Sequence, residues 1–155
     1  MKISVRYDDR PAQGFFKGLQ RNHRNLAPYW KIASISYYQF VQQGFEKEGH
    51  PDAWKPLSPA TIARRRTGKN RAGGLRIRIL RDTGQLLRSA THPDGAGFRE
   101  IHPDHMIIGS NLRYAKYHHD GTRNMPRRRF FQFDNTILAR MGDLMNRAAL
   151  RDAQR

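Results

Sequence analysis

The sequence predicts an α+β fold in which a small antiparallel β-sheet packs with one long helix, a C-terminal helix and short helices. Two observations support this prediction. Apolar residues recur every three or four positions from Leu26 to Lys47, as on one face of a long helix. Short alternating segments at 89–92, 98–102 and 105–109 are separated by turn signals, as in a β-meander. Neither a repeat nor a clean linker divides the sequence, so residues 1–155 are expected to form a single domain.

The elements before the meander follow from local signals. Residues 3–7 alternate as a short strand, and residues 11–25 are compatible with a short helix. Gly49 and the His50-Pro51 pair are expected to end the long helix. Ser58 and Pro59 form an N-cap and first helical position, so a short helix is expected at 60–66.

The remaining elements are a basic loop and three further segments. Glycine-rich residues 67–74 lack apolar periodicity, and we expect an extended basic loop or arm within 69–81 that is flexible in the free subunit. Asp82 or Thr83 is placed to cap a short helix through Leu86, Leu87 and Ser89. Residues 113–119 suit a helix that ends at Gly121, and residues 125–133 suit a returning strand. Asp134 is a suitable N-cap for a last helix, whose apolar face is Ile137, Met141, Leu144, Met145 and Ala148.

The composition limits the classes of function. The chain has 29 Lys and Arg against 13 Asp and Glu, a formal net charge of +16. The absence of cysteine excludes a disulfide scaffold, a thiolate zinc site and a Cys nucleophile. No apolar run is long enough to span a membrane, and the N-terminal residues do not form a signal peptide. Assembly in a reducing cytoplasm is therefore expected.

The positive charge is concentrated in runs that contain no acid, Arg64 to Arg66 and Arg127 to Arg129. Such runs attract phosphate or acidic protein surfaces. Interleaving with Phe130 and Phe131 would also allow stacking on bases, but the simpler interpretation is that the phenylalanines are core or interface residues and the arginines point outward.

Catalysis is not indicated. His118 and His119 are adjacent, so on a helix they would point about 100° apart and rarely share a metal ion. The carboxylates are mostly scattered, and there is no nucleophile motif or phosphate-binding loop. We therefore predict that the protein is not an enzyme and has no catalytic residue, metal or cofactor.

Four short motifs, in this order, resemble those of the phage virion morphogenesis family, also described as tail-completion proteins. They are Trp54 to Thr61 with Arg64 and Arg65, Leu80 to Leu86 with Ser89, Tyr114-Ala115 with His118 and Gly121, and Met125 to Phe130. Arg127 departs from the pattern, because the family commonly has a small residue there.

The resemblance implies a structural virion protein at the head–tail junction of a tailed phage, assembled in the host cytoplasm. As a tail-completion, tail-terminator or neck protein it would form a ring, often a hexamer, that joins the tail to the DNA-filled head. The expected partners are neighbouring neck or connector and tail-tube proteins, with packaged DNA passing through the ring. A free basic nucleic-acid-binding protein is the alternative, and a phage nuclease is a third reading that would need Mg²⁺-dependent cleavage.

Structural roles are expected for the motif residues. Trp54 and Leu57 would anchor an extended arm, Thr83 and Gly84 would start a helix, and Phe130 would be buried. Tyr114 and His118 would form hydrogen bonds across the domain, Gly121 would adopt a positive φ, and Pro126 belongs to the last motif. The broad apolar surface of the long helix places Ile32 and Ile35 at an oligomer interface. The side chains expected to face DNA or an acidic partner are Arg64, Arg65, Arg66, Arg127, Arg128 and Arg129.

Overall fold

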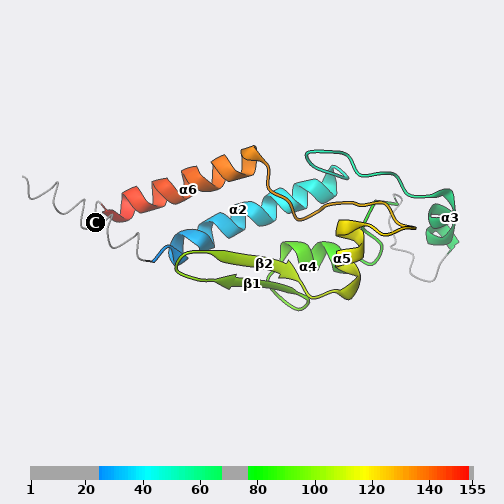
Figure 1. Cartoon of the computed structure of the whole chain (residues 1–155), viewed down its shortest axis with the longest axis horizontal. Helices are drawn as coiled ribbons and strands as arrows, with labels where there is room; N and C mark the ends of the chain where they lie inside the picture. The colour runs from blue at the N-terminus through cyan, green and yellow to red at the C-terminus, as the bar shows by residue number, and fades with distance from the viewer. Residues whose placement is uncertain (1–24, 68–76, 154–155) are drawn as a thin grey trace, which may run out of the picture.

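The computed structural model describes residues 25–67 and 77–153. Helices α2 (Ala27–Glu46) and α6 (Asn135–Ala153) run side by side in opposite directions along the elongated molecule (Figure 1). A two-stranded antiparallel sheet, β1 (Gly97–Ile101) and β2 (Met106–Ser110), lies beside α2 together with α4 (Gln85–Thr91). Helix α5 (Arg113–Asp120) follows the sheet, and α3 (Pro59–Thr67) lies at one end of the molecule. The predicted α+β class is confirmed.

The core lies between α2 and the elements around it. Buried side chains on α2 recur at helical spacing and meet the buried face of α6, where Ile137 is 1% exposed. Phe45 at the end of α2 is fully buried and packs edge-on against Trp54, with ring centroids 5.3 Å apart. Phe130 lies 5.8 Å from Phe45, so the segments around Trp54 and Phe130 close the core at this end of α2.

Two of the expected helix caps are present. The Ser58 hydroxyl accepts a hydrogen bond from the backbone N–H of Thr61, at 3.3 Å, and starts α3 at Pro59. The Asp134 carboxylate accepts from the N–H of Ile137, at 2.8 Å, and starts α6. Helix α4 begins differently, because its N-cap is Gly84, with φ of 81°, while the Thr83 hydroxyl accepts from the N–H of Gln85.

Two expected strands are wrong. Ser89 and Thr91 end α4, and their hydroxyls donate to the carbonyls of Leu86 and Leu87, as hydroxyl side chains do on a helix. The sheet within the described residues therefore has two strands, not three. Residues 126–130, expected to belong to a returning strand, form no ladder with another described strand, and Phe133 is 55% exposed.

Part of the expected basic loop is anchored. Residues 68–76 lie outside the described residues, as do the strand at 3–7 and nearly all of the short helix at 11–25. Ile79 and Leu80, however, are 8% and 6% exposed. The N–H of Ile79 donates to the carboxylate of Glu48, and Arg78 donates to the carbonyl of Glu46. These bonds fix residues 78–80 to the end of α2, so the flexible arm cannot extend through 81 as expected.

Candidate functional site

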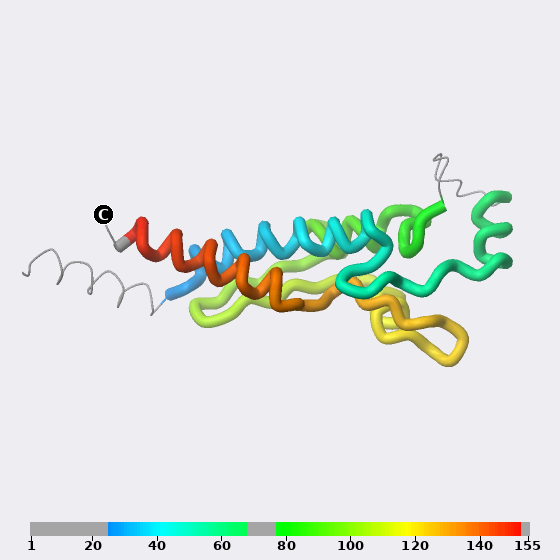
Figure 2. Tube along the Cα trace, turned by 90° about the horizontal axis from the view of Figure 1, so that it is seen from above, coloured from blue at the N-terminus to red at the C-terminus, as the bar shows by residue number. Residues whose placement is uncertain are grey.

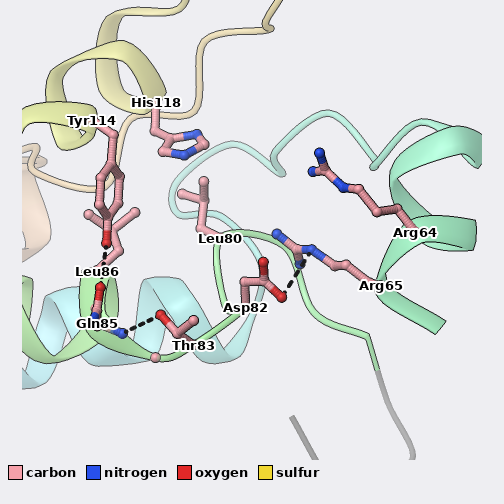
Figure 3. Close-up of a pocket in the computed structure, with 10 residues that line it drawn as sticks. Arg64, Arg65, Leu80, Asp82, Thr83, Gln85, Leu86, Tyr114 and His118 are labelled. Carbon is pink, nitrogen blue, oxygen red and sulfur yellow. Dashed lines mark hydrogen bonds and ion pairs between the residues drawn. The ribbon is translucent and has the colours of Figure 1, made fainter. Parts of the chain in front are cut away.

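Three of the four motifs meet at one pocket of about 310 Å³, which we call the motif pocket (Figure 3). One wall comes from α3, one from the segment before α4 together with the start of α4, and one from α5. The lining residues are Arg64, Arg65, Leu80, Asp82, Thr83, Gly84, Gln85, Leu86, Tyr114 and His118. The sequence predicted structural roles for several of these residues but did not predict that they share a pocket.

Arg65 connects α3 to the opposite wall of the pocket. Its terminal nitrogen donates to the carbonyl of Arg78 at 2.8 Å, and its Nε lies 3.6 Å from a carboxylate oxygen of Asp82. Arg64, its neighbour on α3, is exposed and also lines the pocket. Both side chains extend from α3 toward the segment that carries Leu80 and Asp82 (Figure 3).

The α5 wall is held by contacts to α4. The Tyr114 hydroxyl donates to the side-chain oxygen of Gln85 at 3.5 Å, as expected. His118 was expected to bond across the domain as well, but its Nδ1 makes no hydrogen bond within the described residues. The ring of His118 meets Tyr114 edge-on, with centroids 5.9 Å apart. Desolvation by burial, followed by the nearby Arg128 and Arg65 guanidinium groups, holds the pKa of His118 below its usual value, so its imidazole is neutral at pH 7.

The fourth motif lies behind the pocket. Arg128 was expected to point outward with its neighbours, but it is only 5% exposed. Its guanidinium donates to the carbonyls of Lys55 and Pro56, at 2.9 and 3.0 Å, and its backbone N–H donates to the carbonyl of His118. Arg127 and Arg129 are exposed. Arg128 therefore ties the extended segment before α3 to the segment after α5.

The other motif residues support this connection. The Trp54 indole donates to the carbonyl of Arg129 at 2.8 Å, and Leu57 is partly buried against the core. Phe130 is 5% exposed, and Pro126 precedes it in the same extended segment. Gly121 ends α5 with φ of 79°, and a Cβ there would lie 2.8 Å from the backbone nitrogen of Arg127, so only glycine fits.

The remaining expected site residues lie elsewhere. Ile35 is 57% exposed on α2, whereas Ile32 is partly buried. Arg66 is exposed on α3. Sequence reasoning missed Glu48, whose bond to Ile79 joins segments 31 residues apart. No local pattern marks such a pair.

Two kinds of site are absent from the described part of the chain. Residues 25–67 and 77–153 contain no group of three or more His, Asp or Glu side chains placed to hold a metal ion. Among the same residues, no helix has the length and apolar character needed to cross a bilayer.

Comparison with known proteins gives one match. The sequence profile described as the phage virion morphogenesis family matches residues 7–149, which is nearly the whole chain. No curated protein and no solved structure matches it. The chain belongs to the phage virion morphogenesis family, and its role is in the structure or assembly of a phage virion.

Proposed function

We propose that the protein is a non-enzymatic ring subunit at the head–tail junction, where it completes the tail or neck and joins it to the DNA-filled head. The observation that carries this proposal is α3, which has nine residues and no buried side chain. A helix this short is marginal in water unless a packed face stabilises it. A neighbouring subunit or virion protein would supply that face.

A closed ring made of one kind of subunit uses two different surfaces of each subunit. The exposed helix α3 is one candidate surface, and the face of α2 that carries Ile35 is the other. The two surfaces lie on separate elements of the elongated molecule (Figure 1). This separation supports a head-to-tail contact rather than a self-complementary one.

Substitution of Ile35 tests the ring. Ile35→Asp should block assembly while leaving the subunit folded, because the side chain is 57% exposed and contributes little to the core. Asn146→Asp, at an exposed position on α6, is the control for added charge. Sedimentation would measure the assembly state, and circular dichroism would measure folding. Normal rings from Ile35→Asp would remove Ile35 from the interface.

The exposed arginines are proposed to face the DNA path or an acidic neighbouring ring. Because Arg65 and Arg128 have partners within the subunit, the candidates are Arg64, Arg66, Arg127 and Arg129. Replacing all four with Gln should weaken head–tail joining, and wild-type joining should weaken as salt rises. Joining to DNA-free tails separates a protein surface from packaged DNA.

The position of the protein in the virion and its role in joining heads to tails can be tested together. A gold label on the protein should appear at the head–tail junction in negative-stain images, and particles that lack the protein should contain unjoined heads and tails. Tight, salt-dependent DNA binding by the isolated subunit, with no label at the junction, would instead support a free nucleic-acid-binding protein.

A further inference from the structure

We propose that the motif pocket binds an Asp or Glu side chain of a protein partner, whose carboxylate lies between Arg64 and Arg65. The inference deepens the proposed function, on which it rests for the statement that the partner is another virion protein. The pocket, its charges and its apolar floor are features of the subunit itself.

More positive than negative side chains lie around the pocket: Arg64, Arg65 and Arg128 against Asp82. Arg65 is near Arg128, and each of them acts on His118. In the described part of the chain, the carboxylate within ion-pair distance of these two guanidinium groups is Asp82, at 3.6 Å from Arg65. Arg128 is almost fully buried and is bonded to backbone carbonyls. A partly buried cluster of like charges is costly, and a second carboxylate would offset that cost.

Two buried polar atoms at the pocket also lack a hydrogen bond to any described residue. The Nε of Arg65 and the Nδ1 of His118 are buried, and neither makes a hydrogen bond within the described residues. Buried polar atoms in folded proteins are nearly always paired. In this part of the chain, His118 Nδ1 has no hydrogen bond, and Arg65 Nε has only the 3.6 Å ion pair with Asp82. These two atoms lie on facing walls of one pocket and indicate that the isolated subunit is incomplete here. A carboxylate accepts hydrogen bonds only, which suits a site with several N–H donors.

The apolar floor distinguishes a protein side chain from DNA. Leu80 and Leu86, which are 6% and 4% exposed, line the pocket beside the arginines (Figure 3). The CH₂ groups of Asp or Glu can pack against these leucines while the carboxylate reaches the guanidinium groups. A DNA phosphate belongs to a continuous backbone that is contacted by protruding side chains. Asp82 would also repel a row of phosphates more strongly than it repels one carboxylate.

A peptide titration of the full-length protein tests the pocket without any virion. The probe is acetyl-Gly-Leu-Glu-Leu-Glu-Gly-amide, and the readout is the backbone amide signals in ¹⁵N NMR spectra. We expect the peptide to shift the signals of Gly84, Leu86 and Tyr114. The same peptide with Gln in place of Glu should cause no such shifts.

A pair of charge variants makes the test specific. Arg64→Gln should weaken peptide binding about tenfold, which corresponds to about 1.4 kcal/mol. Arg147→Gln removes the same charge from an exposed position on α6 and should bind as the wild type does. Arg64 is exposed, so its variant should remain folded, and the NMR spectrum itself would verify this.

The proposal is overturned if the Glu peptide leaves the pocket signals unchanged or if Arg64→Gln and Arg147→Gln bind equally. It is also overturned if a DNA duplex of about 12 base pairs shifts the pocket signals and the peptide does not. These outcomes differ from failure of the proposed function. A label found away from the head–tail junction would refute the junction role while leaving binding by the pocket intact.

Discussion

Along the pair formed by α2 and α6, apolar side chains are buried at helical spacing, and the charged residues lie outside the core. Helix α3 lies at one end of the molecule, away from this helix pair (Figure 2), and buries no side chain. Its Arg65 instead forms an ion pair with Asp82 and donates a hydrogen bond to the carbonyl of Arg78. Near α3, Arg128 is buried and Arg65 is half-buried. The helix pair therefore supplies stability, whereas the region around α3 carries groups suited to binding. Substitutions in the two regions should have separable effects.

The largest expected effect is a stability loss from the helix pair. Ile137→Ala removes a side chain that is 1% exposed on α6 and should lower the free energy of unfolding by about 3 kcal/mol. Ile62→Ala makes the same change on α3, where the side chain is partly exposed, and should cost less than about 1 kcal/mol. Urea unfolding measures both. Equal losses would mean that α3 is packed as tightly as α6.

A smaller stability effect is expected behind the motif pocket. Arg128→Met leaves the carbonyls of Lys55 and Pro56 without their donor and should cost about 1–2 kcal/mol. Arg129→Met, at the exposed neighbouring position, should change the free energy of unfolding by less than about 0.5 kcal/mol. If Arg128→Met is the more stable of the two, the buried charge costs more than its hydrogen bonds contribute.

The smallest effect concerns pH. Burial, together with Arg128 and Arg65, holds the pKa of His118 below its value in the unfolded chain, so the unfolded state takes up a proton first as pH falls. His118 therefore destabilises the fold as pH falls through the unfolded-state pKa, until pH reaches the folded-state pKa. His118→Gln should lose less stability than the wild type between pH 7.5 and 5.5. Parallel pH profiles from thermal unfolding would contradict this.

The sequence predicted those elements that depend on residues close together in the chain, such as helix caps and apolar helix faces. The apolar spacing of α2 and the side-chain caps Ser58 and Asp134 set the helices within one or two residues of their observed bounds. The strand expected at 89–92 was wrong because Ser89 and Thr91 satisfy their hydroxyls on the preceding helical turn. Hydroxyl and β-branched residues next to a turn signal are compatible with either structure.

Long-range contacts explain what the sequence did not reveal about the site. In the segment 127–130, Arg128 and Phe130 are buried and Arg127 and Arg129 are exposed, whereas all three arginines were expected to point outward. Nothing in the run of three arginines itself indicates which of them is buried. Arg128 is the buried one because the backbone carbonyls of Lys55 and Pro56 accept its hydrogen bonds, and these residues are more than 70 positions away in the sequence.

The region around α3 should become covered when the virion assembles. The sequence has no cysteine, so single-cysteine variants report one position each. Ala63→Cys lies on the exposed helix α3, and Asp104→Cys lies at the turn between β1 and β2, where the native side chain is 81% exposed. Maleimide labelling of each variant, free and in purified virions, measures coverage. We predict that Cys at 63 reacts in the free subunit and is protected in virions, whereas Cys at 104 loses less of its reactivity. Equal reactivity of Cys at 63 in both states would contradict the account.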